Sequence, residues 1–241
     1  LSQWYLQGVE TSATNFEDAW DTTTGAADTV IAVLDTGILE HPDLAGRALP
    51  GYDFVDGESS TSFVAANDGD GWDDDPSDPG DWVTSAESQS GPLRDCDVSS
   101  SSWHGTRVAA MIAATTDNAE GIAGGMWTGK VLPVRVLGKC GGYDSDIIAG
   151  MRWAAGLPVE DLPLNPNPAR ILNVSLGSPG SCVPQYRTAF TELAEAGVLV
   201  VASAGNDSGP VETPANCSGV LAVAGLRQVG TKVGYSSLGS E

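Results

Sequence analysis

Three short runs in this chain carry side chains that together suit acyl transfer. Asp35 ends an apolar stretch, His104 opens a segment of small apolar residues, and Asn206 lies in a glycine-containing loop. An aspartate can orient a histidine, the histidine can act as a general base, and an asparagine amide can stabilise an oxyanion. A serine hydroxyl that attacks a carbonyl carbon uses such a set of groups. The residue types and their order therefore indicate acyl transfer by a serine.

Alternating strands and helices would position these groups. Apolar runs predict strands over 30–34, 131–137, 171–176, 198–202 and 220–224, and helices over 104–114, 144–155 and 186–196. This alternation is typical of a parallel sheet with right-handed crossovers. Reactive groups of such sheets gather at the carboxyl ends of the strands, where Asp35, Ser175 and Asn206 lie. Residues 56–103, rich in Asp, Gly, Ser and Pro, predict a long loop.

Length and charge exclude several classes of partner. The chain has 241 residues, a formal net charge of -21 and only 11 Lys and Arg residues. We expect no nucleic acid partner, because too few cations are present to neutralise phosphates. No apolar run is long enough for a membrane span, so we expect no membrane partner. No signal-like segment opens the chain, which is typical of a mature or processed protein, and no linker divides residues 1–241, which we interpret as part of one domain.

The four cysteines favour an extracellular protein. They lie at positions that lack the spacing of a zinc site, and four cysteines allow three pairings. We favour Cys96–Cys140 and Cys182–Cys217, because each pair links loop ends of neighbouring elements in the predicted sheet. Disulfides would place the protein outside the cytosol, whereas four free cysteines buried in the core are the alternative.

An acidic segment within the long loop suggests a calcium site. Six aspartates fall within residues 68–78, and their like charges repel unless water or a cation neutralises them. Alternating Asp and Gly lets several oxygens converge on a hard cation such as Ca²⁺. The expected ligands are Asp68, Asp70, Asp73, Asp75 and Asp78. A solvated acidic loop without metal is the alternative.

Four runs, taken in order, resemble the motifs of the subtilases, the subtilisin-like serine proteases. They are Val-Leu-Asp-Thr-Gly at 33–37, His-Gly-Thr-Arg-Val-Ala at 104–109, Asn-Val-Ser-Leu-Gly at 173–177 and Ala-Ser-Ala-Gly-Asn at 202–206. The resemblance covers the chain from about Gln3 onward. The stretch 137–146 is similar to that of secreted bacterial members with extra loops and disulfides. The implied fold is α/β, a three-layer subtilisin-like arrangement with a mostly parallel twisted sheet and helices on both faces, incomplete in this chain.

The resemblance implies a role for each matching residue in a secreted serine endopeptidase. His104 would take the serine proton and return it to the leaving amine, Asp35 would hold the imidazole tautomer, and Asn206 would donate its amide to the oxyanion. A peptide or protein substrate would pair with the enzyme as an extended strand. Its binding walls would be Gly141, Gly142 and Tyr143 on one side, and Ser175, Leu176 and Gly177 with Ala204 and Gly205 on the other.

The family's serine is absent from this sequence. The resemblance implies a late helix that carries a run of the Gly-Thr-Ser-Met-Ala kind, and no such run occurs among the 241 residues. We expect a C-terminal fragment of the same protease, bound to this chain, to supply that serine. Three explanations fit: a nicked protein with a second chain, a piece of a longer chain, or a non-catalytic relative that binds calcium or peptides.

A second calcium site and a specificity residue follow from the same resemblance. The family's tight calcium site would comprise the side chains of Gln3, Asp43 and Asn118 with the carbonyl oxygens of Thr116, Glu120 and Ile122. Glu212 lies near the position where members of the family close the bottom of the S1 pocket, which holds the P1 residue on the amino side of the cut bond. A carboxylate there would favour Lys or Arg, unless it points to solvent. Without it, Leu176 and the glycine-rich walls favour large apolar residues.

Overall fold

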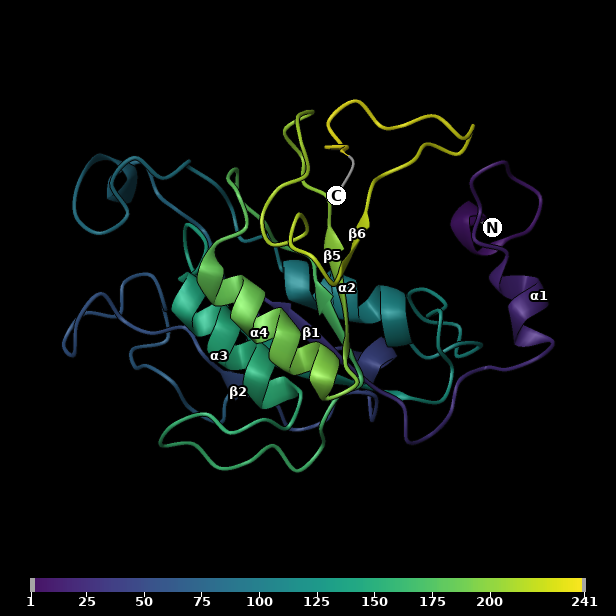
Figure 1. The fold of residues 1–241 in the computed structure, drawn as a ribbon, viewed down its shortest axis with the longest axis horizontal. Helices are drawn as coiled ribbons and strands as arrows, with labels where there is room; N and C mark the ends of the chain where they lie inside the picture. Colours follow the sequence, from purple (N-terminus) through teal and green to yellow (C-terminus); the bar gives the residue numbers. More distant parts are fainter. Residues whose placement is uncertain (1–2, 240–241) are drawn as a thin grey trace.

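Six parallel strands form one sheet in the computed structural model, which describes residues 3–239 (Figure 1). The order across the sheet is β2-β3-β1-β4-β5-β6. The strands are β1 (Val30–Asp35), β2 (Tyr52–Asp53), β3 (Lys130–Arg135), β4 (Ile171–Val174), β5 (Leu199–Ser203) and β6 (Val220–Val223). All neighbouring strands pair in parallel, which confirms the predicted fold class. The two-residue strand β2 was not predicted, because it is too short to show a period.

Strand β3 ends two residues earlier than the sequence predicted. The amides of Val136 and Leu137 both donate to the carbonyl oxygen of Asp35, at 2.9 and 3.2 Å, so the chain turns there. In the sheet Asp35 is paired with Arg135, and Leu34 with Val174. The aspartate therefore lies at the carboxyl edge, as expected for a reactive group on a parallel sheet.

Within residues 3–239, four α-helices and three 3₁₀-helices accompany the sheet. The α-helices are α1 (Phe16–Trp20), α2 (His104–Ala113), α3 (Asp144–Ala154) and α4 (Pro184–Glu195), and the 3₁₀-helices are η1 (Trp4–Leu6), η2 (Pro42–Leu44) and η3 (Glu87–Gln89). Helices α2, α3 and α4 fall where the sequence predicted helices, with ends shifted by at most two residues. No helix among residues 3–239 is long and apolar enough to cross a membrane.

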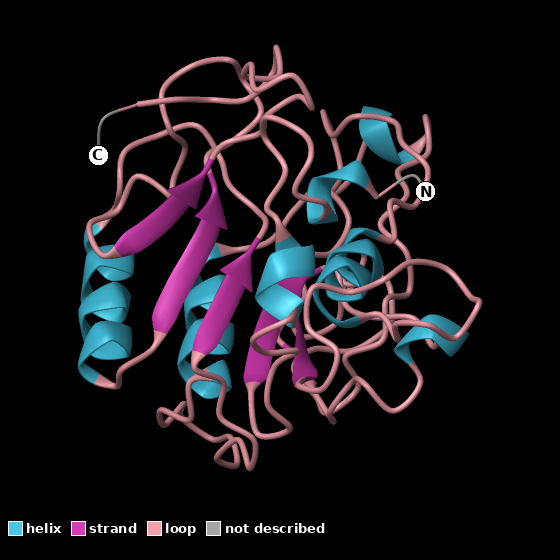
Figure 2. Cartoon of the chain, turned by 90° about the vertical axis from the view of Figure 1, so that its right-hand side faces the viewer, coloured by secondary structure: helices cyan, strands magenta, loops and turns pink. Residues whose placement is uncertain are grey.

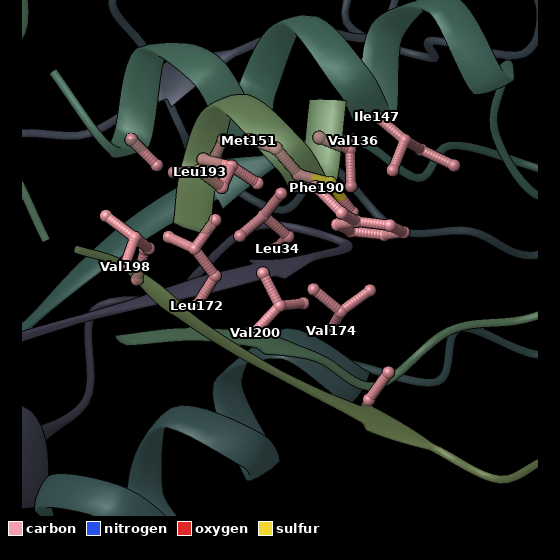
Figure 3. Packing of buried hydrophobic residues seen from close by; sticks show 14 of the residues in the cluster. Leu34, Val136, Ile147, Met151, Leu172, Val174, Phe190, Leu193, Val198 and Val200 are labelled. Atoms are coloured by element: carbon pink, nitrogen blue, oxygen red, sulfur yellow. The ribbon is translucent and has the colours of Figure 1, made fainter. Parts of the chain in front are cut away.

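Successive strand residues point to opposite faces of the sheet, and each face has its own core. Leu34, Leu172, Val174 and Val200 pack against α3 and α4 in the larger cluster (Figure 3). On the other face, Val33 and Val131 pack with Ala109 and Ala113 of α2 in a smaller cluster. Helices thus cover both faces, as a three-layer fold requires.

Helix α2 covers only the part of its face formed by β1 and β3 (Figure 2). Beyond it, apolar side chains of β5 and β6 face outward: Leu199, Leu221 and Val223 are 46%, 53% and 51% exposed. These three side chains are called the open sheet face below. Apolar residues on a central layer of an α/β fold are normally covered, so this face is suited to a further packing element.

Two disulfides tie loops to the sheet edge. Cys96 pairs with Cys140, and Cys182 pairs with Cys217, with Cα atoms 5.7 and 5.1 Å apart. This is the pairing favoured from the sequence, and the alternative of four free cysteines is wrong. The first disulfide anchors the long loop to the segment that follows β3.

Candidate active site

Asp35 and His104 form a close pair at the carboxyl edge of the sheet. Asp35 ends β1 and its side chain is fully buried, whereas His104 is the first residue of α2 with a side chain 45% exposed. The imidazole Nδ1 lies 2.8 Å from each carboxylate oxygen. A carboxylate on Nδ1 favours the tautomer that carries its proton there and leaves Nε2 to act as a base.

Hydrogen bonds made by Thr36 hold this pair in place. The amide of Gly105 donates to Thr36 Oγ1 at 3.0 Å, and that hydroxyl donates to Asp78 Oδ2 at 2.6 Å. The amide of Thr36 donates to Asp35 Oδ1 at 2.8 Å. Thr36 therefore joins the end of β1, the start of α2 and the acidic loop.

The start of α2 also depends on a glycine. A Cβ atom on Gly105 would lie 2.1 Å from the carbonyl oxygen of Gly37 and 3.1 Å from Cβ of Asp35. Real Cβ atoms do not approach backbone oxygen so closely. The absence of a side chain at position 105 is therefore what allows His104 to reach Asp35.

The pair shifts the pKa of the histidine. The hydrogen bond that His104 Nδ1 donates to the Asp35 carboxylate raises the pKa of His104 above 6.5, burial works against this rise, and the charges of Asp35 and Asp81 add to it. The carboxylate stabilises the imidazolium form, which a general base must pass through during proton transfer.

His104 opens onto a cleft of about 520 Å³ that also contains Asn206. The predicted substrate-binding residues that line this cleft are Gly141, Ser175, Leu176, Gly177 and Gly205, and Glu212, predicted near the S1 pocket, lines it too. Strand ends therefore bring together segments that are distant in the chain. Asn206 follows β5, and its backbone amide donates to Glu212 Oε1 at 2.8 Å, which orders the loop that carries its side chain.

Three predicted binding residues lie outside this cleft. Gly142 lines an adjoining hollow beside Gly177, and Tyr143, 53% exposed, lines another hollow near Val55. Ala204 is buried, with its amide donating to the carbonyl oxygen of Val223. Gly141 therefore lines the same cleft as His104, whereas Tyr143 does not.

Thr36 and Asp81 were not singled out from the sequence. Thr36 lies within the Asp-Thr-Gly run at 35–37, so that motif could have identified it. Asp81 accepts hydrogen bonds from the amide and hydroxyl of Ser102, at 2.6 and 2.7 Å, and the Ser102 hydroxyl in turn accepts from the amide of His104 at 3.2 Å. No local pattern could have identified Asp81, because its partner is 21 residues away.

The carboxylates of the acidic loop do not converge as the sequence predicted. Asp68 pairs with the buried Arg135, which also pairs with Asp53. Asp78 is buried and accepts from Thr36 and from the amide of Gly80. Asp70, Asp73 and Asp75 remain in a loop whose Asp73 and Asp75 carboxylates accept from nearby amides. Across residues 3–239, no three acidic, histidine or cysteine side chains gather as a metal group, so a calcium site in this loop stays a prediction.

The second predicted calcium site is better assembled. Asp43 is 2% exposed and accepts from Asn118 Nδ2 at 2.8 Å and from the amide of Ile122 at 2.9 Å. Gln3 joins the same loop, with Oε1 accepting from the amide of Ala123 at 2.8 Å. Within the described residues no cationic side chain pairs with Asp43, which leaves a buried carboxylate among amides.

Several oxygen atoms of the adjoining loop have no hydrogen-bond partner within residues 3–239. Thr116 Oγ1 is buried and has no hydrogen-bond partner. The carbonyl oxygens of Thr116, Glu120 and Ile122 accept no hydrogen bond from any residue in 3–239. A Cβ atom on Gly121 would lie 2.2 Å from Asp43 Oδ2, so the loop closes tightly over the carboxylate. Carboxylate, amide and carbonyl oxygens are the donors that Ca²⁺ prefers, and this set fits it.

Comparison with known proteins places the chain in a family. Residues 26–241 match the family described as the subtilase family. The chain is 43% identical over 242 residues to an extracellular protease of Xanthomonas campestris pv. campestris, and 40% identical over 240 residues to an extracellular basic protease of Dichelobacter nodosus. The chain belongs to the subtilase family.

The structure agrees with this assignment. A solved protease structure from Pseudoalteromonas arctica superposes with a TM-score of 0.89 at 43% sequence identity, covering 98% of this chain and 66% of that one. The alignments cover 100% and 99% of this chain, but only 40% and 39% of the Xanthomonas and Dichelobacter proteins. The chain thus spans about two fifths of the length of these relatives.

Proposed function

We propose that this chain forms part of a secreted serine endopeptidase that cleaves peptide bonds through an acyl-enzyme. The observation that carries the proposal is the buried Asp35 carboxylate on Nδ1 of His104, beside a cleft that Asn206 also lines. Secretion is supported by the two disulfides and by relatives that are named extracellular.

In this mechanism each of the three residues has a distinct role. Nε2 of His104 takes the proton of the serine hydroxyl as its oxygen attacks the scissile carbonyl carbon. Asp35 stabilises the resulting imidazolium, and the side-chain amide of Asn206 donates to the carbonyl oxygen as it becomes negative. His104 then gives its proton to the leaving amine, which departs from the acyl-enzyme, and the same base later activates water.

We propose that the serine comes from a C-terminal fragment of the same protease that packs on the open sheet face. Support comes from Leu199, Leu221 and Val223, which present apolar surface beside α2, and from Met111 of α2, which is 45% exposed. Burial of such apolar surface would stabilise the assembled protein by about 25 cal/mol per Å². A helix seated there would adjoin the same sheet edge as His104.

We propose Ca²⁺ as a structural cofactor held by Gln3, Asp43 and Asn118 with the carbonyl oxygens of Thr116, Glu120 and Ile122. The support is the buried Asp43 carboxylate, which pairs with no cationic side chain within residues 3–239, and the carbonyl oxygens of the adjoining loop that accept no hydrogen bond there. Calcium there supplies positive charge to the loop and takes no part in peptide cleavage. Its effect would be on stability.

Labelling with a serine-directed fluorophosphonate tests the proposed activity. Native protein would be treated with the probe in calcium buffer and examined by denaturing gel and intact mass. Label on a separate smaller band identifies a nicked protease, and label on one longer chain identifies a continuous one. The His104→Ala variant should lose the label. Failure of the wild-type protein to react would instead favour the non-catalytic relative that binds calcium or peptide.

A further inference from the structure

The first two amides of α2 are held by hydroxyl groups from outside the helix. The amide of His104 donates to Ser102 Oγ at 3.2 Å, and the amide of Gly105 donates to Thr36 Oγ1 at 3.0 Å. Both amides belong to the first turn, where a helix supplies no acceptor of its own. The His104 side chain is 45% exposed, so the direction of the imidazole also depends on where the backbone places the first residue of the helix.

Each of these hydroxyls gives its own proton to a carboxylate of the long loop. Thr36 Oγ1 donates to Asp78 Oδ2 at 2.6 Å, and Ser102 Oγ donates to Asp81 Oδ2 at 2.7 Å. A hydroxyl has a single proton, so one that donates to a carboxylate presents a lone pair to the amide. Hydrogen bonds to an ionised acceptor are also stronger than neutral ones. The two carboxylates therefore fix the orientation of both hydroxyls.

Both oxygens of each carboxylate are used. Asp78 Oδ1 accepts from the amide of Gly80 at 2.9 Å, while Oδ2 accepts from Thr36. Asp81 Oδ1 accepts from the amide of Ser102 at 2.6 Å, while Oδ2 accepts from the hydroxyl of the same residue. An asparagine has only one side-chain oxygen, and its NH₂ group would face a donor. Each position therefore requires a carboxylate rather than any polar group of that size.

The backbone of the long loop also packs against the end of β1. The amide of Ile38 donates to the carbonyl oxygen of Pro76 at 3.0 Å, and the amide of Asp78 donates to that of Ile38 at 3.1 Å. A Cβ atom on Gly37, which has a φ of 101°, would lie 2.7 Å from the Pro76 carbonyl oxygen. Trp103, the residue before α2, has a φ of 51°, a left-handed conformation that neighbouring contacts must hold in a non-glycine residue.

We propose that Asp78 and Asp81 are positioning residues for His104, an inference that rests on the proposed peptidase function. They act through the hydroxyls of Thr36 and Ser102, which hold the first two amides of α2 and so fix the direction of the imidazole. Misplacement of a reacting group by 1 Å can slow a reaction on the order of 10²-fold. The long loop thereby orients the general base from outside the catalytic pair.

Double-mutant cycles in the complete protease test this assignment. Asp78→Asn and Thr36→Val should each lower kcat by about 10- to 10²-fold with little change in KM. The double variant should lose no more than either alone, because both substitutions remove the same link. Thr36→Ser keeps the hydroxyl and should keep kcat near that of wild type. Asp81→Asn and Ser102→Ala form a second cycle with the same expectation for kcat, and Asp74→Asn, an exposed change in the same loop, should keep wild-type kinetics.

Two kinetic results would overturn the assignment. One is a loss of kcat that adds in the double variants, and the other is a lower melting temperature with kcat unchanged, which would leave the carboxylates a purely structural role. If Asp78→Asn does not fold, the cycle at Asp81 and Ser102 decides.

Proton NMR of the same protein separates this inference from the proposed function, because it needs no chemical step. The proton between His104 Nδ1 and Asp35 should give a downfield signal, and the amides of His104 and Gly105 should exchange slowly with solvent. If no peptide is cleaved, the peptidase function fails, yet a downfield signal that Asp78→Asn shifts or broadens, with faster exchange at Gly105, still supports the positioning role. A signal and exchange rates unchanged in both aspartate variants would overturn it.

Discussion

Asp35 and His104 are 69 residues apart in the chain, yet both carboxylate oxygens of Asp35 lie 2.8 Å from Nδ1 of the imidazole. The contact is made where a buried strand ends and a helix begins. Its geometry depends on Gly105, which lets the helix approach β1, and on Thr36, which holds the helix start. The electrostatic environment of His104 is thus a product of backbone packing.

Removing the charge of Asp35 should abolish most of the activity. In the complete protease, the Asp35→Asn variant should lower kcat/KM by roughly 10³–10⁴-fold, because the amide no longer holds the reactive tautomer or stabilises the imidazolium. Peptide hydrolysis at saturating and low substrate measures the loss. The Asp28→Asn variant, an exposed aspartate before β1, is the matched control and should retain wild-type activity. A nearly active Asp35→Asn enzyme would show that the pair is not catalytic.

The raised pKa of His104 predicts how activity varies with pH. The base must be neutral to accept a proton, so the acid limb of kcat/KM should have its midpoint above 6.5. The Asp35→Asn substitution should move the histidine titration to lower pH. NMR titration of the chain, with a His41→Gln variant to assign the two histidine signals, measures this directly. A midpoint unchanged by the substitution would contradict the assigned cause.

The same pKa shift links stability to pH. Because the folded-state pKa of His104 lies above its unfolded value of about 6.5, its contribution to stability is fully present below pH 6.5 and is lost as pH rises through the folded pKa. The difference in unfolding free energy between wild type and Asp35→Asn should therefore shrink from pH 6 to pH 9. Urea denaturation across this range tests it, and a difference that grows with pH would be inconsistent.

A single methyl group at the start of α2 should disturb both stability and geometry. Alanine normally stabilises a helix relative to glycine, but on Gly105 its Cβ would clash with the carbonyl oxygen of Gly37. We expect Gly105→Ala to destabilise the protein by roughly 1–3 kcal/mol and to lower kcat. Arg107→Ala, an exposed change in the same helix, should stay within about 0.5 kcal/mol of wild type. Equal denaturation midpoints for the two variants would show that the helix start adapts.

Calcium should raise the thermal stability through Asp43. At a free calcium concentration about 1,000 times Kd, binding to the folded state adds about 4 kcal/mol, and chelation removes it. Thermal melts with calcium or chelator measure the difference. The Asp43→Asn variant should lose the response, whereas Asp73→Asn in the acidic loop should keep it. The opposite pattern would show that calcium binds in the acidic loop and not at Asp43.

The sequence was most informative where patterns are local. The continuous apolar run before Asp35 predicted a strand, and the small apolar residues that follow His104 predicted a helix. The alternation of strands and helices predicted that the sheet is parallel. The four family motifs then indicated which strand ends meet. The order of strands and helices was therefore sufficient to predict that Asn206 and His104 meet at one edge of the sheet.

Long-range pairing explains what the sequence did not reveal. The acidic run suggested a metal because its charges needed neutralisation, but Arg135, 67 residues from Asp68, supplies part of it. The burial of Glu212 likewise depends on Ser237, 25 residues later. Neither partner is implied by local spacing, so the choice between a solvent-exposed and a buried carboxylate required the fold.

The outward-facing Leu199, Leu221 and Val223 also affect how this stretch of chain behaves as an isolated polypeptide. Leu221 and Val223 lie on β6, an edge strand whose backbone can pair with another strand. Recombinant preparations of these residues alone would be prone to self-association and precipitation. Charge repulsion at a net charge of -21 opposes that tendency, so solubility should fall as the ionic strength is raised.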